Sequence, residues 1–201
     1  MTDLAPPTGA DGRRLRARGA RTRAKLLAAA EQVFTELGYH EASIVKITEA
    51  AGVAQGTFYL YFGSKQEVFE EVVLDLNRRV RHYVNEAAKE GATRLEREVL
   101  GFRAYFRFAA ENPALYRIMR QAEFVAPHAL KLHYERFSEA YITGLKAAME
   151  AGEIAEADPV VLTWALMGIA ELFGIRTVWQ GIPEAELVEL EAFIGRALGA
   201  K

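Results

Sequence analysis

The chain has 201 residues, enough for one sizeable globular unit or two small ones, and 51% of them are apolar and 26% charged, as in folded soluble proteins. It contains no cysteine, which excludes disulfides and thiolate metal sites. Apolar runs such as 160–170 are shorter than the roughly 18–20 residues of a membrane span. The sequence therefore predicts a soluble, cytoplasmic protein with no membrane partner.

The net charge of −2 conceals an uneven distribution. Residues 1–65 carry nine Lys or Arg against six Asp or Glu, and the remainder carries sixteen against twenty-one. One basic run has no acid inside it and consists of Arg13, Arg14, Arg16, Arg18, Arg21, Arg23 and Lys25. Such a run attracts phosphates whatever their sequence, although a solvated tail has the same composition.

The first 19 residues contain Pro and Gly without an apolar period, which predicts a disordered basic arm. A helix is predicted from Arg21, because apolar residues then recur at spacings of three and four until Gly38. Ser43 is a plausible N-cap for a second, short helix that ends at Gly52. Third and fourth helices follow, the fourth running from near Ser64 to about Lys89.

Beyond Gly91 the pattern predicts four or five more helices, broken at Pro113, Pro127, 152–158 and Pro183. No alternating strand run with a hairpin signal is found, nor an internal repeat. The predicted fold is all-α, with about nine helices.

Residues 44–65, IVKITEAAGVAQGTFYLYFGSK, place two short helices around a tight turn. A helix that enters a DNA major groove presents its N-terminal residues to the base edges. Gln55 has the amide that can bind adenine through two hydrogen bonds. Gly56 would let the backbone approach closely, and Thr57 offers a hydroxyl and a methyl group. These residue types favour a DNA-reading helix over a catalytic site.

Tyr59 and Tyr61 are two residues apart, about 200° around a helix, so they cannot have the same role. We expect one to reach phosphate through its hydroxyl and the other to be partly packed. Lys65 begins the fourth helix, where free backbone N–H groups favour anions. An ordinary helical hairpin with an aromatic-rich surface would give the same spacing.

The stretch Thr48–Lys65, TEAAGVAQGTFYLYFGSK, closely resembles the TetR family of bacterial transcriptional regulators, and the motif-level resemblance covers about residues 21–70. It implies an N-terminal helix-turn-helix DNA-binding domain over 20–65, after the arm of 1–19, and an all-helical ligand-binding and dimerisation domain over 66–201. Thr48 departs from the alanine usual in the family. The basic arm is an addition that could enter a minor groove. The resemblance implies base-proximal contacts by Gln55, Gly56, Thr57, Leu60 and Tyr61, and phosphate contacts by Ser43, Lys46, Thr57, Tyr59 and Lys65.

Aromatic side chains are concentrated between residues 92 and 181. Each could simply be core packing, but TetR-like proteins carry a ligand cavity between their middle helices. We hypothesise a hydrophobic small-molecule effector, such as a hydrophobic acid or its acyl-CoA. Arg103, Arg107, Arg117 and Arg120 could bind its acidic group, or could line a solvated face. The candidate ligand-binding residues are Phe102, Tyr105, Phe106, Tyr116, Met119, Phe124, Tyr134, Phe137, Tyr141, Trp164, Met167 and Glu171.

The helix predicted over 158–181 is apolar on two faces, which requires burial on both sides. One face carries Val161, Trp164, Leu172 and Trp179. The family places the last two helices in a homodimer interface, although a buried helix of a monomer would read similarly. The residues predicted for this interface are Leu162, Leu166, Ile169, Phe173, Leu187, Leu190, Ile194 and Leu198.

These observations predict a ligand-responsive regulator, a repressor, that binds a palindromic operator in double-stranded DNA as a homodimer and is released by its effector. The alternative is an architectural DNA-binding protein with no small-molecule ligand. No GxSxG, HExxH, P-loop or paired-glycine nucleotide motif is present, so no enzyme activity and no cofactor are expected. His128 and His133 lie on poorly matched helix faces, so no metal site is expected either.

Overall fold

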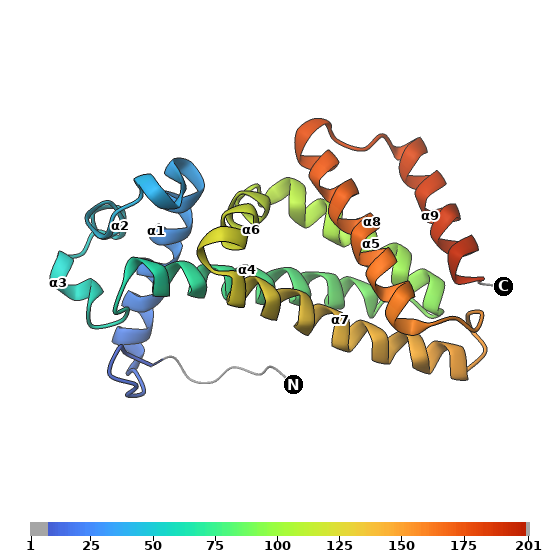
Figure 1. The fold of residues 1–201 in the computed structure, drawn as a ribbon, viewed down its shortest axis with the longest axis horizontal. Helices are drawn as coiled ribbons and strands as arrows, with labels where there is room; N and C mark the ends of the chain where they lie inside the picture. The colour runs from blue at the N-terminus through green and yellow to red at the C-terminus, as the bar shows by residue number, and fades with distance from the viewer. Residues whose placement is uncertain (1–7, 200–201) are drawn as a thin grey trace. The chain divides into compact units, whose positions relative to one another are not determined.

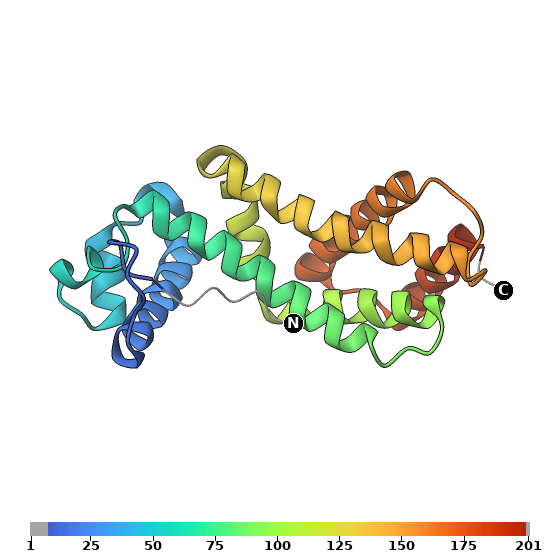
Figure 2. The same cartoon turned by 90° about the horizontal axis from the view of Figure 1, so that it is seen from below.

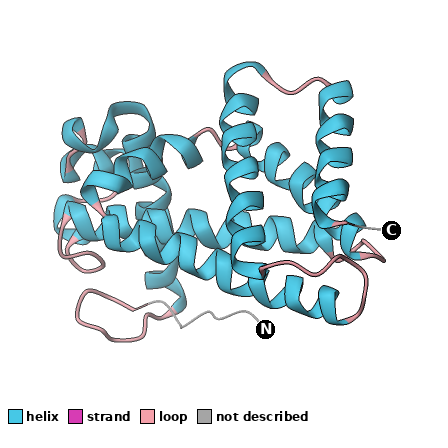
Figure 3. Ribbon diagram, turned by 45° about the vertical axis from the view of Figure 1, so that its right-hand side comes forward, coloured by secondary structure: helices cyan, strands magenta, loops and turns pink. Residues whose placement is uncertain are grey.

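The computed structural model describes residues 8–199, which form nine helices and, as Figures 1 and 3 show, no strand. The predicted all-α fold is therefore confirmed. The helices are α1 (Ala17–Glu41), α2 (Ile44–Ala51), α3 (Gln55–Phe58), α4 (Lys65–Ala88), α5 (Arg94–Glu111), α6 (Ala114–Val125), α7 (Pro127–Glu150), α8 (Pro159–Gln180) and α9 (Glu184–Leu198).

The helices divide into two compact units. The described part of the first unit takes residues 8–75 and 117–130, and the second takes 76–116 and 131–199. The first unit thus extends beyond the boundary at residue 65 that the sequence predicted. The reason is that Val68, Phe69 and Val72, on the first turns of α4, are fully buried and belong to its core.

The first unit is held together by aromatic side chains from separate helices. Phe34 of α1 and Phe69 of α4 meet edge to face with ring centroids 5.0 Å apart. Phe58, at the end of α3, and Phe62, just beyond it, are both fully buried, with centroids 5.6 Å apart. Such pairs add about 0.5–1.5 kcal/mol to the burial of their apolar area. They fix the short α3 against longer helices.

Polar caps explain where several helices begin and end. The Ser43 hydroxyl accepts the backbone N–H of Lys46 at 3.2 Å, as an N-cap does. Gly52 then ends α2 with φ +64°, a conformation that favours glycine. Thr93 and Glu96 form a reciprocal capping box at the start of α5. Asp158 caps α8 ahead of a proline in its first turn, at the start of the helix that the sequence predicted over 158–181.

The second unit packs α5 against α8 and α9. Its core is formed by the buried side chains Phe102, Phe106, Leu145, Ala148, Met149, Ile154, Leu166, Leu190, Ile194 and Leu198. Deep in this unit the carboxylate of Glu98 accepts hydrogen bonds from Arg94 and from the Tyr141 hydroxyl. Burial raises the pKa of both Glu98 and Tyr141. This cluster pins α5 to α7.

Helix α8 combines an apolar composition with unusual exposure. Among the described helices it alone is long and apolar enough to cross a membrane, and only 17% of its most apolar window is buried. The run 160–170 alone is too short to predict a span, whereas the whole helix Pro159–Gln180 is long and apolar enough by composition. Large apolar side chains such as Leu172, 70% exposed, lie on its outer face. The helix also carries Glu171 and Arg176, both of which have hydrogen-bond partners.

The N-terminal arm is more ordered than the sequence predicted. Residues 1–7 lie outside the described part of the chain, but α1 begins at Ala17, and residues 8–14 form a hydrogen-bonded turn. The expectation of disorder through residue 19 was therefore wrong for 8–19. Glycine adds no side chain to an apolar pattern, so its presence favoured a prediction of disorder. It also permits the tight turns that residues 8–14 form.

Candidate functional site

The predicted reading segment forms an exposed surface on the first unit. Helix α3 is only four residues long, and Gln55 and Gly56 at its start are exposed. Leu60, just beyond it, is 64% exposed, whereas Phe58 between them is fully buried. Thr57 is half-buried. The structure thus brings the predicted base-proximal residues together and anchors them through one buried aromatic ring.

The two tyrosines of this segment differ in the way that the spacing predicted. Tyr59 is exposed, with its ring edge-on to Phe58 at 5.5 Å. Tyr61 is half-buried, and its hydroxyl lies 3.7 Å from the position that a Cβ on Gly19 would take. Tyr59 is therefore the exposed tyrosine of the two, and Tyr61 packs towards the start of α1.

The residues around α2 combine capping with exposure. Lys46 is exposed, and its Nζ donates one hydrogen bond to the Glu41 carbonyl at 2.9 Å, which leaves two donors for phosphate. Thr48 is buried, and its hydroxyl donates to the carbonyls of Ile44 and Val45 in its own helix. Threonine thus occupies the family's alanine position without leaving a buried hydroxyl unpaired.

Lys65 has a different role from the phosphate contact that the sequence predicted. Its Nζ donates to the carbonyls of Tyr39 at 2.8 Å, His40 at 3.4 Å and Ala42 at 2.9 Å. It also lies 4.4 Å from the centroid of the Tyr39 ring. An ammonium group has three donors, so no donor remains for DNA in this conformation. Lys65 instead closes the C-terminal end of α1.

Four of the predicted ligand-binding residues form a polar cluster in the second unit. The hydroxyls of Tyr105 and Tyr116 are 2.8 Å apart, and Tyr116 donates to the main-chain carbonyl of Glu171 at 3.3 Å. The Tyr134 hydroxyl donates to the Glu171 carboxylate at 3.1 Å. Burial raises the pKa of Tyr105 to about 12 and raises that of Tyr116 as well. Both tyrosines therefore remain neutral hydrogen-bonding groups.

A glycine makes room for this cluster. A Cβ on Gly174 of α8 would collide with the Tyr116 hydroxyl and would lie 2.8 Å from a ring carbon of Tyr105. The pair of tyrosines therefore depends on glycine at this position.

The other predicted ligand-binding residues are dispersed. Phe102 and Phe106 belong to the closed core, and Tyr141 is bonded to Glu98. Phe124 is 84% exposed and belongs to the first unit, as does the half-buried Met119. The prediction for Phe124 as a cavity residue was wrong, since its side chain faces solvent. The remaining members are the half-buried Phe137 and Met167 and the 49% exposed Trp164.

Two of the four arginines proposed for the effector's acidic group, Arg103 and Arg117, are held by other groups of the protein. Arg103 binds Glu191 of α9 at 2.5 Å and Glu184 at 2.9 Å, and Arg117 donates to the Thr35 carbonyl at 3.2 Å. Arg103 is therefore better explained as a link between α5 and α9. In the described residues no group of three or more His, Asp or Glu side chains could hold a metal ion.

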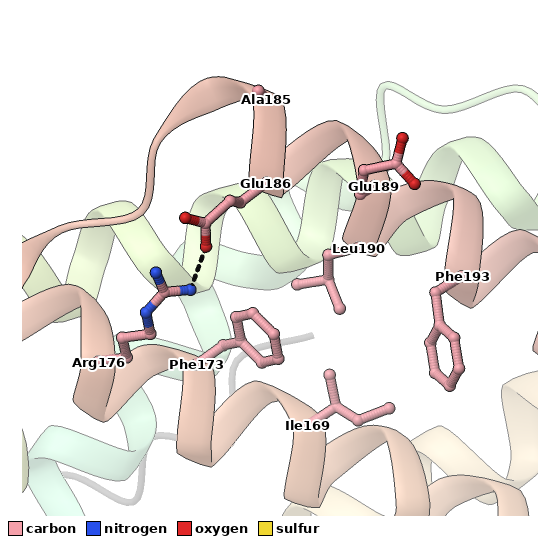
Figure 4. A pocket seen from close by; sticks show the side chains of 8 residues that line it. All are labelled: Ile169, Phe173, Arg176, Ala185, Glu186, Glu189, Leu190 and Phe193. Carbon is pink, nitrogen blue, oxygen red and sulfur yellow. Dashed lines mark hydrogen bonds and ion pairs between the residues drawn. The ribbon is translucent and has the colours of Figure 1, made fainter.

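An open groove of about 680 Å³ runs between α8 and α9 (Figure 4). Its floor carries Phe173 and Leu190, and an ion pair between Arg176 and Glu186 closes one end. No residue of the predicted ligand-binding set lines it. The lining residues are Ile169, Phe173, Arg176, Ala185, Glu186, Glu189, Leu190 and Phe193.

The predicted dimer-interface residues face inwards. Leu166, Leu190, Ile194 and Leu198 are buried in the core of the protomer, and Leu162, Ile169, Phe173 and Leu187 pack against it. The first four were therefore assigned to the wrong face. Because α8 is apolar on every side, its residue pattern does not indicate which side of the helix is exposed. The exposed apolar face consists of Val160, Val161, Trp164, Leu172, Val178 and Trp179 of α8 with Val188 and Phe193 of α9.

His133 of α7 gives the second unit a pH-dependent stability. Its Nδ1 lies 2.6 Å from Nδ2 of the buried Asn77. Burial, and secondarily the positive charge of Arg81, lower the pKa of His133 from 6.5 to about 4. Between these values the unfolded chain binds a proton that the folded chain does not, so stability falls as the pH falls through this window.

We expect the free energy of unfolding to lose up to about 3 kcal/mol between pH 7 and pH 4 through this histidine. Urea unfolding of the wild type and of His133→Gln at several pH values measures the free energy of unfolding of each protein. The contribution of the carboxylates, which both proteins share, cancels in the difference between the two free energies. Parallel pH profiles for the two proteins would contradict this assignment.

Residues 26–72 match the family model for bacterial regulatory proteins of the tetR family. The uncharacterized HTH-type transcriptional regulator YdgC of Bacillus subtilis is 33% identical over 108 residues, which are 52% of this chain and 55% of YdgC. The fatty acid metabolism regulator protein of Bacillus subtilis is 34% identical over 86 residues, 43% of this chain and 44% of that protein. The chain thus spans about half the length of the curated relatives it matches.

Two solved structures resemble the whole fold. A TetR family transcription regulator from Marinobacter aquaeolei VT8 has a TM-score of 0.74 at 18% identity and covers 93% of this chain and 100% of its own. The transcriptional regulator FadR from Bacillus subtilis, solved in complex with stearoyl-CoA, has a TM-score of 0.72 at 24% identity, covering 89% and 99%. The family model therefore assigns residues 26–72 to the bacterial regulatory proteins of the tetR family, and the likeness to these two structures shows that the whole chain shares their fold.

Proposed function

We propose that the protein is a ligand-responsive transcriptional repressor that binds a palindromic operator as a homodimer. One observation carries the DNA-binding part: Gln55, Gly56, Tyr59 and Leu60 are all exposed on one short segment whose core residue Phe58 is fully buried. A segment that is anchored in this way can present the Gln55 amide to base edges while neighbouring hydroxyl and ammonium groups bind phosphates.

The roles of Gln55 and Tyr59 can be separated by substitution. Gln55→Ala should lower the discrimination between operator base pairs by about 1–3 kcal/mol at one position of each half-site. Tyr59→Phe should weaken binding similarly for every operator variant, because phosphate contacts carry no base information. Fluorescence anisotropy with a set of single-substitution operators measures both effects.

Gln32→Ala is the matched control for this experiment. Gln32 is an exposed glutamine of α1 in the same unit, and its amide donates a hydrogen bond to the Glu36 carboxylate within α1. It should leave both affinity and base preference unchanged. If Gln55→Ala and Tyr59→Phe reduced binding with the same base pattern, the proposed division of roles would be wrong.

The exposed apolar face of α8 and α9 supports the homodimer. Monomeric proteins rarely leave so many large apolar side chains in contact with water, and α8 carries Trp164, Leu172 and Trp179 on this face. A two-fold axis would bury the same face of both copies. A palindromic operator would then offer each copy one half-site, with the two half-sites about 34 Å, one turn of DNA, apart.

The effector is proposed to be a hydrophobic acid or its acyl-CoA thioester. The support is the concentration of aromatic side chains in the second unit, the hydroxyl cluster of Tyr105 and Tyr116, and the stearoyl-CoA complex of the Bacillus subtilis regulator with the same fold. Release from DNA requires the effector to bind one conformation more tightly than the other. Helix α4 runs from the first unit into the second and is the proposed connection.

Acyl-CoAs of graded chain length test the effector. We expect long-chain thioesters to release the protein from its operator, and Tyr116→Phe to raise the concentration needed, because a hydroxyl of the polar cluster is lost. Anisotropy titration of the preformed DNA complex measures the release. Undiminished DNA binding at saturating acyl-CoA and free acid would instead favour the alternative, an architectural DNA-binding protein without a ligand.

A further inference from the structure

Residues 8–14 form a closed turn that the sequence did not predict. The Gly9 N–H donates to the Arg13 carbonyl at 2.9 Å, and the Gly12 N–H donates to the Gly9 carbonyl at 2.9 Å. The Asp11 carboxylate accepts the Arg13 N–H at 3.0 Å. Gly12 has φ +75°, which suits glycine at a tight turn. Figure 2 shows this dark-blue segment beside the helices of the first unit.

The turn is attached to the end of the reading segment. The Ala10 N–H donates to the Leu60 carbonyl at 3.0 Å, a group left without a helical partner where α3 ends. Gly9 is buried there, and a Cβ on it would lie 3.0 Å from the same carbonyl oxygen. Leu15 continues the contact, with its side chain within 3.5 Å of the Cβ positions of both Gly9 and Gly19. The arm is therefore packed on the first unit.

The arginines at the end of the turn and just after it are available to a partner. Arg14, Arg16 and Arg18 are exposed, and none of them forms an ion pair with a residue in the described part of the chain. The pair between Arg13 and Asp11 is loose, at 3.7 Å, and solvent-exposed. Between Asp11 and Glu31 the sequence contains no acid. The segment that is attached to Leu60 thus leads directly into a run of exposed arginines.

We propose that the turn of residues 8–14, together with the arginines at its end and just after it (Arg14, Arg16 and Arg18), is a second DNA-contacting element, fixed to the end of α3, and that these arginines hold the phosphates that flank the bases read by α3. This inference rests on the proposed function. A turn that is already docked adds contacts without the entropy cost of ordering a free arm. Because it is tied back to Leu60, it is not free to extend along a minor groove, and phosphate is the expected partner.

Two variants test the element in different ways. Arg14→Ala with Arg16→Ala removes two charges, and the matched control removes two exposed charges from the second unit through Arg136→Ala with Lys146→Ala. Gly9→Val keeps every charge but places side-chain atoms against the Leu60 carbonyl, and so should undock the turn. Affinity is measured by anisotropy between 50 and about 200 mM salt, on operators with A·T-rich and with G·C-rich flanks.

The double arginine variant should bind about 5–50-fold more weakly, with the slope of log K against log salt reduced by about 1–2. Gly9→Val should lower the affinity for the operator several-fold. For each variant, the loss should be the same on operators with A·T-rich and with G·C-rich flanks. If both variants bound with wild-type affinity and salt slope, this inference would be wrong while the proposed function would stand. A loss of affinity confined to operators with A·T-rich flanks would also overturn the inference, because it would indicate a minor-groove contact. Failure of the wild type to bind DNA would overturn the proposed function as well.

Discussion

Lys65→Met is expected to lower the melting temperature of the protein by about 5–10 °C and to weaken operator binding as a consequence. The Lys65 ammonium donates to the carbonyls of Tyr39, His40 and Ala42, and methionine keeps only the apolar stem. Hydrogen bonds to charged groups each contribute about 1.5–3 kcal/mol, and because they share one group we expect a combined loss of about 2–3 kcal/mol.

Lys46→Met is the matched control, because Lys46 is exposed and uses only one donor within the protein. It should weaken DNA binding and reduce its salt dependence with little change in melting temperature. Thermal unfolding and anisotropy on the same samples distinguish the two lysines. Should Lys65→Met melt like the wild type yet bind DNA weakly, Lys65 would be a phosphate ligand after all.

Leu172→Glu should convert the protein to a monomer and thereby abolish operator binding. Leu172 is 70% exposed on α8, so the monomer should fold normally. Burying a leucine contributes about 1.5–3 kcal/mol, and a two-fold interface loses this contribution twice and must bury two unpaired carboxylates. We expect the dimer dissociation constant to rise by at least about 1,000-fold, as measured by sedimentation velocity.

Phe124→Glu makes the same change of polarity at an exposed residue of the first unit and should leave the dimer intact. Because α8 could by composition span a bilayer, flotation with phospholipid vesicles belongs in the same experiment. A Leu172→Glu protein that remains dimeric would contradict the proposed face. The proposal of a dimer interface on this face would also be wrong if the wild-type protein bound to the vesicles and did not self-associate.

Local patterns in the sequence were sufficient to predict the helices. Ser43 and Gly52 each cap the helix end that was predicted for them, because caps depend on neighbours a few residues away. The exposure of Gln55 and Leu60 around the buried Phe58 also follows from a short amphipathic segment. What a pattern within one helix can determine was therefore predicted correctly.

Contacts between distant segments could not be predicted in the same way. The partners of Lys65 lie 23–26 residues earlier in the chain, and nothing beside Lys65 in the sequence indicates them. The exposed face of α8 depends on where α5 and α9 pack, since the helix is apolar all round. The arm looked disordered by composition, yet the Leu60 carbonyl supplies the hydrogen bond that holds it.

The distribution of tryptophan gives the protein an optical reporter of its own. The chain has only two tryptophans, and both Trp164 and Trp179 lie on the outer face of α8, 49% and 71% exposed. Their emission should move to shorter wavelength when that face leaves water and to longer wavelength on dilution. Self-association can thus be followed at nanomolar concentration without attaching a dye.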